Sequence, residues 1–209
     1  PGSLVGSEMC IRDSFKAAID AGAKTIMINS GIINGIPVHS SYKILTDLLR
    51  NRLGFEGVIL TDWEDINKLH DRDKIVSSKK EAIRLAINAG IDMSMVPYEY
   101  EEFIDNLMEL VNEGKVTMDR IDEAVSKILK LKFELDLFEN PSTSPSDYND
   151  FDSEEFQGMA YQSAAEAITL LKNNDNILPL ERDKKILVVG PNADNMRCLN
   201  GAWTYSWQG

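Results

Sequence analysis

The sequence predicts an α/β fold with a parallel sheet, because three short apolar runs alternate with two helical patterns. Residues 21–29, 54–63 and 89–97 each hold a run of Val, Ile, Leu or Met that follows a glycine, as buried parallel strands do. Residues 42–49 and 82–89 carry apolar side chains at helical spacing. Strands and helices that alternate in this way form right-handed crossovers. Three such units are too few to close an eight-stranded barrel, so we expect the C-terminal part of a (β/α)8 TIM-type barrel.

After the third strand, two more helices are expected to complete this first domain, which we place at residues 15–138. Apolar residues recur at helical spacing within residues 103–111 and again within residues 121–129. Gly114 is placed to end the first of these helices as a C′ glycine. Thr117 is placed to cap the start of the second helix.

A change of composition marks the end of the first domain. Residues 139–155 are rich in Asn, Pro, Ser, Thr and Asp, and are therefore predicted to be a linker. A helix over residues 156–171 and an apolar strand over residues 186–189 are expected to follow it. We interpret residues 156–209 as the start of a second α/β sandwich domain, too short to be complete.

Two residues at the end of the central apolar run are the main candidates for a functional site. The run over residues 58–61 leads directly into Asp62 and Trp63, which are predicted to lie at the end of the strand and just beyond it. In barrels of alternating strands and helices, the carboxyl ends of the strands carry the chemistry. A carboxylate beside an indole suits a sugar, since the indole can stack on the ring while the carboxylate meets the anomeric carbon. The local pattern equally allows Asp62 to cap the next helix, with Trp63 packed over it.

Composition and charge exclude several classes of partner. A net charge of −12 over 209 residues argues against nucleic acid and against an anionic membrane surface. No apolar run approaches the ~20 residues of a membrane-spanning helix. Cys10 and Cys198 make no disulfide framework, and the two histidines belong to no cluster that predicts a metal site. The turn at residues 190–194 lacks the G-x-G-x-x-G pattern, so no nucleotide cofactor is expected.

Five blocks of the sequence stand in an order that is typical of one enzyme family. The blocks are Gly54–Trp63, Ala89–Met93, Leu135–Pro141, Ala167–Asn173 with Leu178–Leu180, and Gly201–Gly209. In this order they resemble the centre of a glycoside hydrolase family 3 enzyme, of the β-glucosidase or exo-β-glucanase kind. The last block resembles the exo-glucanase branch in particular. The resemblance begins at about Phe15, and it implies that the chain is a truncated fragment of a longer enzyme.

The resemblance implies a retaining, cofactor-free enzyme that hydrolyses terminal β-D-glucosyl residues of glucosides or β-glucans. Retaining glycosidases use two carboxyl groups roughly 5–5.5 Å apart. Asp62 matches the nucleophile, and the acid/base is expected beyond Gly209, in missing parts of the same chain. Trp63 and Trp207 resemble the two indoles that clamp the leaving-group sugar. Trp203 is expected to pack at a domain interface.

Other polar residues close to these blocks are expected to have structural roles. Glu64 and Asp65 follow the matched nucleophile, but the family gives neither a proton-transfer role, so we expect them to be solvated loop charges. His39 and Asp92 are expected to be structural, Asp92 by capping or anchoring the last strand. Ser30 stands where the exo-glucanase pattern tends to place a tyrosine. That departure alters the expected shape of the sugar pocket.

The N-terminal segment is interpreted as foreign to the protein. Residues 4–14 have neither helical nor alternating periodicity, and codons for them can spell a transposon-type sequencing adapter. We therefore expect residues 1–14 to be non-native and exclude them from the fold. A genuine divergent loop is the alternative.

Two other functions stay open from the sequence alone. The chain could be a carbohydrate-binding fragment without turnover, because the expected acid/base and half of the sugar pocket lie outside it. It could also belong to the β-N-acetylhexosaminidase branch of the same family, although Trp63 and the Trp203/Trp207 block favour the glucosidase branch. The resemblance favours a periplasmic or extracellular location, which the residues themselves do not determine.

Overall fold

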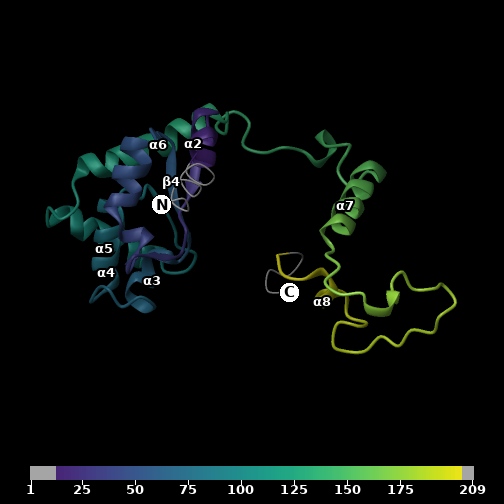
Figure 1. Cartoon of the computed structure of the whole chain (residues 1–209). Coiled ribbons are helices and arrows are strands. Elements are labelled where there is room, and N and C mark those ends of the chain that lie inside the picture. Colours follow the sequence, from purple (N-terminus) through teal and green to yellow (C-terminus); the bar gives the residue numbers. More distant parts are fainter. Residues whose placement is uncertain (1–12, 204–209) are drawn as a thin grey trace. The chain divides into compact units, whose positions relative to one another are not determined.

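The computed structural model describes residues 13–203, and the chain divides into two units after Thr143 (Figure 1). Unit 1 comprises the described residues up to Thr143, and unit 2 comprises those from Ser144 onward. The division lies within residues 139–155, whose composition predicts a linker. The foreign segment proposed for residues 1–14 lies almost entirely outside the described residues.

Unit 1 is built on a three-stranded parallel sheet with the strand order β1-β4-β5. The strands are β1 (Thr25–Met27), β4 (Val58–Trp63) and β5 (Met93–Met95). Ile26 of β1 pairs with Ile59 of β4, and Leu60 of β4 pairs with Met93 of β5. The predicted parallel sheet, with helices between its strands, is confirmed.

The central strand is longer than the sequence predicted. β4 continues through Asp62 and Trp63 instead of ending at Thr61, because β5 offers further partners at its end. Trp63 pairs with Met95, and the backbone N–H of Glu64 donates to the carbonyl of Met95 at 2.9 Å. Both candidate residues therefore belong to the sheet, which holds side chains more firmly than a loop does.

The helical segments of unit 1 described here are α2 (Asp13–Asp20), η2 (Val38–Ser40), the π-helical η3 (Lys43–Arg52), α3 (Asp65–Asp71), α4 (Lys79–Ala89), α5 (Tyr100–Asn112) and α6 (Met118–Glu134). Four of them, η3, α4, α5 and α6, occupy the predicted regions, whereas α2, η2 and α3 were not predicted. Thr117 caps α6 as predicted, since its hydroxyl accepts from the N–H of Arg120 at 3.2 Å. Gly114 follows α5 with a φ of 68°, the left-handed conformation expected of a C′ glycine.

A small antiparallel hairpin follows β1. Its strands are β2 (Ile32–Ile33) and β3 (Ile36–Pro37). The turn consists of Asn34 and Gly35, both with positive φ, which is the pairing that two-residue hairpin turns favour. The hairpin leads the chain from the carboxyl end of β1 into η2.

The hydrophobic core lies on one face of the sheet. Ile59 of β4 and Ile91, just before β5, are both 0% exposed. They belong to one cluster of buried side chains with Leu45 of η3 and with Ile83 and Ala86 of α4. Burial of such side chains contributes about 1.5–3 kcal/mol each, so this face supplies most of the stabilisation of unit 1.

The opposite face of the sheet is open. Met27, Leu60 and Met93 are in register across the three strands and therefore share a face. Met27 is 52% exposed and Met93 is 50% exposed. Parallel sheets normally have both faces covered. The row Met27–Leu60–Met93, here called the open row, is thus an apolar surface without a covering layer in the described part of unit 1.

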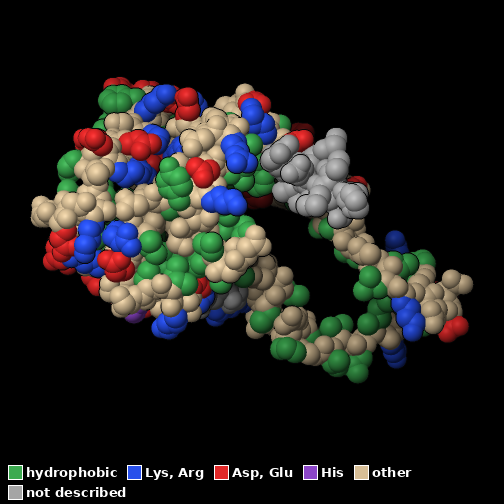
Figure 2. Space-filling model, turned by 60° about the vertical axis from the view of Figure 1, so that its left-hand side comes forward, with side chains coloured by type: hydrophobic (Ala, Val, Ile, Leu, Met, Phe, Trp, Pro, Cys, Tyr) green, Lys and Arg blue, Asp and Glu red, His purple; other side chains and the backbone are tan. Residues whose placement is uncertain are grey.

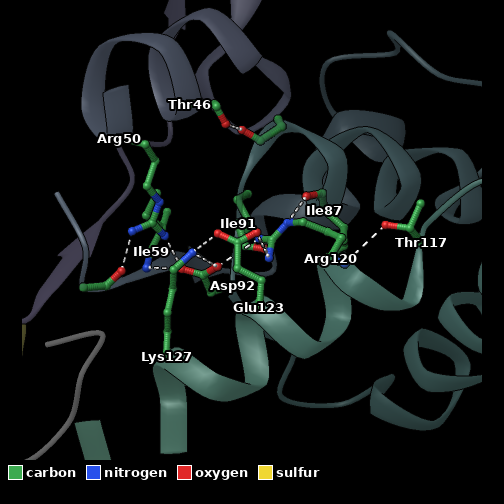
Figure 3. Close-up of polar contacts among 12 residues, drawn as sticks. Thr46, Arg50, Ile59, Ile87, Ile91, Asp92, Thr117, Arg120, Glu123 and Lys127 are labelled. Atoms are coloured by element: carbon green, nitrogen blue, oxygen red, sulfur yellow. Dashed lines mark hydrogen bonds and ion pairs between the residues drawn. The ribbon is translucent and has the colours of Figure 1, made fainter. Parts of the chain in front are cut away.

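A buried carboxylate connects this sheet to two helices (Figure 3). The side chain of Asp92 is 0% exposed and forms an ion pair with Arg50 of η3. It also accepts from the backbone N–H of Ile59 and from the guanidinium of Arg120 in α6, each at 2.9 Å. Nζ of Lys127 lies 3.7 Å from the same carboxylate. The prediction that Asp92 anchors the last strand is confirmed.

The two arginines around Asp92 also bind backbone carbonyls. Arg50 donates to the carbonyls of Phe55 at 3.0 Å and Gly57 at 2.6 Å, and so fixes the loop that enters β4. Arg120 donates to the carbonyls of Ile87 at 3.1 Å and Ile91 at 2.7 Å. Each guanidinium thus donates to backbone carbonyls at the end of a helix or loop. It also balances the negative charge of the carboxylate.

Charges of both signs are interspersed on one face of unit 1. Figure 2 shows Lys and Arg side chains lying beside Asp and Glu on the face in view. Lys80, for example, bonds Glu109 and Glu113 at 2.7 Å each, which links α4 to α5 and its end. This face therefore presents no single-sign patch of the kind that nucleic acid binds.

Unit 2 has helical turns but no buried residue among its described residues 144–203. Its elements are η4 (Pro145–Asp147), α7 (Glu154–Ala167), η5 (Asn174–Asn176) and α8 (Met196–Asn200). The predicted helix over residues 156–171 is α7, which starts earlier because Ser153 caps it and ends before Ile168.

The strand predicted over residues 186–189 is not formed in the described part of unit 2. The side chains of Ile186 and Leu187 are 62% and 85% exposed, and no strand is present there. A strand exists only when its backbone groups have a partner strand, and residues 144–203 supply none. The prediction of a strand over residues 186–189 is therefore wrong for the described part of this chain.

Replacing Asp92 tests the anchoring role. In Asp92→Ala, two guanidinium groups and an ammonium group lose their shared buried partner, which costs about 3–5 kcal/mol. Backbone amides of α6 should then exchange with deuterium roughly a hundredfold faster, as measured by hydrogen-exchange mass spectrometry. Asp105→Ala, at an exposed position of α5, is the matched control and should leave α6 unchanged. Equal exchange in the two variants would contradict the anchoring role.

Candidate active site

Asp62 and Trp63 lie at the carboxyl end of the central strand. Asp62 is half-buried and Trp63 is 44% exposed. Because β1, β4 and β5 are parallel, the chain segments that follow all three strands meet at this edge. The segment after β1 brings Ser30, and the segment after β5 brings Tyr98. The edge therefore gathers polar and aromatic side chains from three distant parts of the sequence.

A β-bulge sets the direction of Asp62. Leu60 pairs with Met93 and Trp63 pairs with Met95, so β4 has one more residue than β5 between these pairs. The hydroxyl of Thr61, a 0% exposed residue, accepts from the N–H of Met95 and donates to the carbonyl of Asp62, at 2.9 and 2.8 Å. Bulges redirect side chains and are frequent beside active sites. The sequence analysis missed this bulge, because it depends on Met95, which lies 34 residues after Thr61 in the sequence.

One oxygen of Asp62 is held and the other is open. Oδ1 accepts from the backbone N–H of Trp63 at 2.6 Å. No residue among 13–203 donates to Oδ2. The following helix α3 has Glu64 at its N-cap position and no side-chain cap, so Asp62 does not cap it. The alternative in which Asp62 is a helix cap is therefore wrong, and its carboxylate is oriented with one oxygen available.

An aromatic pair stands beside this carboxylate. The rings of Trp63 and Tyr98 meet edge to face, with centroids 5.9 Å apart and planes at 80°. Tyr98 is 73% exposed, so the pair lies at the surface and not in the core. The sequence analysis found Trp63 but missed Tyr98. Only the position of Tyr98 shortly after the third apolar run could have indicated it.

Asp65 is buried, contrary to the expectation of a solvated loop charge. Its side chain is 1% exposed. The hydroxyl of Ser30 donates to Oδ1 at 2.7 Å, and Nζ of Lys68 lies 2.6 Å from the same atom. Glu64 has a positive φ of 55°, which reverses the chain and turns Asp65 inward at the start of α3. The sequence pattern gives no sign of this backbone conformation.

His39 lies next to Asp65 in the same buried cluster. Its Nε2 is 3.3 Å from Oδ2 of Asp65, although the two atoms lack hydrogen-bond geometry. Burial lowers the pKa of His39 below its ordinary value of 6.5, and this effect outweighs the opposing attraction of Asp65. The imidazole is therefore neutral near pH 7. Its burial agrees with the structural role expected from the sequence.

Ser30 is fixed from two sides. Besides donating to Asp65, its Oγ and carbonyl accept from the guanidinium of Arg72, at 3.3 and 3.2 Å. Arg72 follows α3 and also pairs with Asp73 at 2.7 Å. The exo-glucanase pattern tends to place a tyrosine at this position. This chain instead has a serine, whose small side chain is hydrogen-bonded to Arg72 at the end of α3.

The other two tryptophans lie outside unit 1, and a cavity of unit 1 lies at the other end of the sheet. Trp207 lies outside the described residues. Trp203 belongs to unit 2, and its packing at a domain interface stays a prediction. The cavity, of about 200 Å³, is lined by residues that include Lys24, Gly57 and Lys130. It lies at the amino ends of β1 and β4, opposite the edge that carries Asp62.

Neither a metal-binding cluster nor a membrane-spanning helix is present in the described part of the chain. No group of three or more His, Cys, Asp or Glu side chains within residues 13–203 is arranged to hold a metal ion. No helix in this range is long and apolar enough to cross a membrane.

The lowered pKa of His39 predicts acid sensitivity. The unfolded chain takes up a proton at His39 near pH 6.5, whereas the folded chain does so only at lower pH. The contribution of neutral His39 to the free energy of unfolding is therefore present above pH 6.5. It is lost as the pH falls from 6.5 toward the lowered pKa. Urea denaturation at pH 7.5 and 5.5 measures this loss. It should shrink in His39→Gln and persist in His70→Gln, and equal losses in both variants would refute the assignment.

Comparisons with known proteins agree with this architecture. Residues 10–131 match the model of the glycosyl hydrolase family 3 N terminal domain, and residues 168–209 match the glycosyl hydrolase family 3 C-terminal domain. The chain is 48% identical over 201 residues to a lysosomal beta glucosidase of Dictyostelium discoideum, covering 94% of this chain and 24% of that protein. It is 34% identical to a periplasmic beta-glucosidase of Salmonella typhimurium, covering 91% and 25%. The chain thus spans about a quarter of the length of these curated relatives.

Solved structures give the same result. An exo-1,3/1,4-beta-glucanase from a Pseudoalteromonas species has a TM-score of 0.73 at 33% identity, over 92% of this chain and 31% of that one. A beta-glucosidase from Listeria innocua in complex with glucose has a TM-score of 0.68 at 33% identity, over 80% and 23%. The family model for the N-terminal domain alone covers more than half of the chain, so the chain belongs to glycosyl hydrolase family 3.

Proposed function

We propose that this chain carries the nucleophile half of the active site of a retaining β-glucosidase that removes terminal β-D-glucosyl residues from glucosides or β-glucans. The observation that carries the proposal is the pose of Asp62 at the carboxyl end of β4, with Oδ1 held by the N–H of Trp63 at 2.6 Å. Family membership and the activities for which the relatives are named support it.

In this proposal Asp62 attacks the anomeric carbon with its open oxygen. The leaving group departs with a proton from an acid/base outside this chain, and a covalent glycosyl–enzyme ester remains on Asp62. Water, activated by the same acid/base, then cleaves the ester and releases the sugar with retained configuration. The bulge and the hydroxyl of Thr61 keep the attacking carboxylate in place throughout.

Trp63 serves the leaving-group side of the site. Its indole follows the nucleophile directly and is 44% exposed, so a ring face remains available to a sugar. Trp207, matched through the last sequence block, is proposed to contact the other side of the leaving-group sugar, opposite Trp63. An exo-glucanase is among the similar solved structures, which supports a leaving group made of further sugar units.

The open row supports a barrel context for this site. In a (β/α)8 barrel, inward side chains stack in layers drawn from alternate strands, and these layers fill the interior. Met27, Leu60 and Met93 share one face of the sheet, which is the face that such layers would fill once the remaining strands are in place. We infer that β1, β4 and β5 are the last strands of a barrel. Residues 139–155 then link this barrel to a second α/β sandwich domain. The site requires the missing strands of the barrel as partners. The relatives described as lysosomal and periplasmic support an exported location.

Removing the nucleophile's charge tests the central claim. Asp62→Asn in the full-length enzyme should lower hydrolysis of an aryl β-glucoside by several powers of ten, because the covalent step is lost. A 2-deoxy-2-fluoro glucoside should label the peptide that contains Asp62 in the native enzyme and not in the variant. Asp105→Asn, on an exposed face of α5, should behave as the native enzyme does. Binding without labelling would favour a non-catalytic carbohydrate-binding fragment.

The leaving-group role of the indoles can be tested by substrate choice. Trp63→Ala and Trp207→Ala should lower kcat/KM for a β-glucan oligosaccharide by about tenfold, the loss expected from one aromatic contact. An aryl glucoside with a small activated leaving group should lose much less. Matched losses on both substrates would assign the two residues to packing.

A further inference from the structure

Tyr98 lies outside the five sequence blocks that resemble the enzyme family, so the resemblance assigns it no role. Its ring meets Trp63 at 5.9 Å with the planes at 80°, and it is nevertheless 73% exposed. The contact buries little surface, so it contributes little to the stability of unit 1. An edge-to-face contact does, however, restrict the rotation of both rings. Because aromatic pairs prefer this arrangement, the contact favours one orientation of the Trp63 indole.

The backbone that leads to Tyr98 is restricted by hydrogen bonds and by a proline. Met95 is fixed to β4 on both sides, since its N–H donates to the hydroxyl of Thr61 and its carbonyl accepts from the N–H of Glu64, each at 2.9 Å. Two residues later Pro97 restricts the chain, because its ring fixes φ. Tyr98 follows immediately. The same two hydrogen bonds also fix the bulge that orients Asp62.

We propose that Tyr98 is a positioning residue that braces the indole of Trp63 for the leaving-group sugar. The proposal rests on the function proposed above for Trp63. It makes Tyr98 a residue that determines the selectivity of the enzyme for oligosaccharide leaving groups. Among residues 13–203, none forms a hydrogen bond with the hydroxyl of Tyr98. The ring and not the hydroxyl is therefore the acting part, and phenylalanine should replace tyrosine without loss.

The first test needs no catalysis. In the 209-residue chain with Trp203→Phe and Trp207→Phe, Trp63 is the one remaining tryptophan. Acrylamide quenching of its fluorescence should increase in Tyr98→Ala and stay unchanged in Tyr98→Phe. Tyr100→Ala is the matched control, because Tyr100 is also an exposed tyrosine, at the start of α5. Unchanged quenching in Tyr98→Ala would overturn the brace.

The second test uses the full-length enzyme. Tyr98→Ala should lower kcat/KM for a β-glucan oligosaccharide by about two- to tenfold, mainly through KM, the range expected for one aromatic pair. Hydrolysis of an aryl glucoside with a small leaving group should change less than about twofold, and Tyr98→Phe should restore the native values. When Trp63→Ala is already present, adding Tyr98→Ala should cause no further loss. Additive losses, or equal losses on both substrates, would overturn the proposal.

The two proposals fail in distinguishable ways. If Asp62→Asn retains turnover, the proposed function is wrong, while the quenching experiment still decides whether Tyr98 braces Trp63. If Asp62→Asn is inactive and Tyr98→Ala is selective for neither substrate, the proposed function stands and the brace is wrong.

Discussion

The carboxylate of Asp92 holds together the parts of unit 1 that local sequence would leave separate. It lies in the loop before β5, yet it binds η3 through Arg50, β4 through the N–H of Ile59 and α6 through Arg120. A lone buried carboxylate would be strongly destabilising. Here the cost of removing it from water is offset by charged donors that themselves serve backbone carbonyls. Asp92 thus connects three elements that are far apart in the sequence.

Charge balance around Asp92 extends to Glu123. Arg50, Arg120 and Lys127 exceed the single negative charge of Asp92, and Glu123 compensates by bonding Lys127 and lying 3.6 Å from Nη1 of Arg120. Burial would raise the pKa of Glu123, but its hydrogen bond to Lys127 and the nearby cations lower it below its ordinary value. The cluster is thus a network with alternating charges, which is how buried charges become tolerable.

The anchor and the candidate site lie toward opposite ends of β4. Asp92 holds the strand at Ile59, near its start, whereas Thr61 and Met95 hold it at its end. Asp62 therefore projects from a strand fixed at both ends. In parallel α/β sheets, ligands generally bind at the carboxyl ends of the strands, which is the end that carries Asp62. The separation of the two ends lets the loops at the edge with Asp62 vary without disturbing the anchor.

Local pattern was enough to predict part of this structure. Apolar runs marked the three strands, and the positions of Thr117 and Gly114 marked helix ends, because each depends on chemistry within a few residues. The bulge at Thr61 and the inward turn at Glu64 could not be predicted, since both depend on partners 30 or more residues away in the sequence.

The same reason explains the remaining errors. Burial of Asp65 depends on Ser30, which lies 35 residues earlier in the chain. The apolar run over residues 186–189 had the correct β propensity but no partner among the described residues. At the candidate site, the residue types of Asp62 and Trp63 were evident, whereas the contact with Tyr98 required the strand order β4-β5.

The open row has a chemical consequence of its own. Two of its three side chains are methionines, whose unbranched thioethers can adapt to covering side chains of many shapes. Thioethers are also oxidised to sulfoxides, which are polar and disrupt apolar contacts. Met27 and Met93 are half-exposed as long as this face is uncovered. Oxidation of either sulfur would therefore make this apolar face polar, and any layer that covers the open row would protect the sulfur atoms as well as the fold.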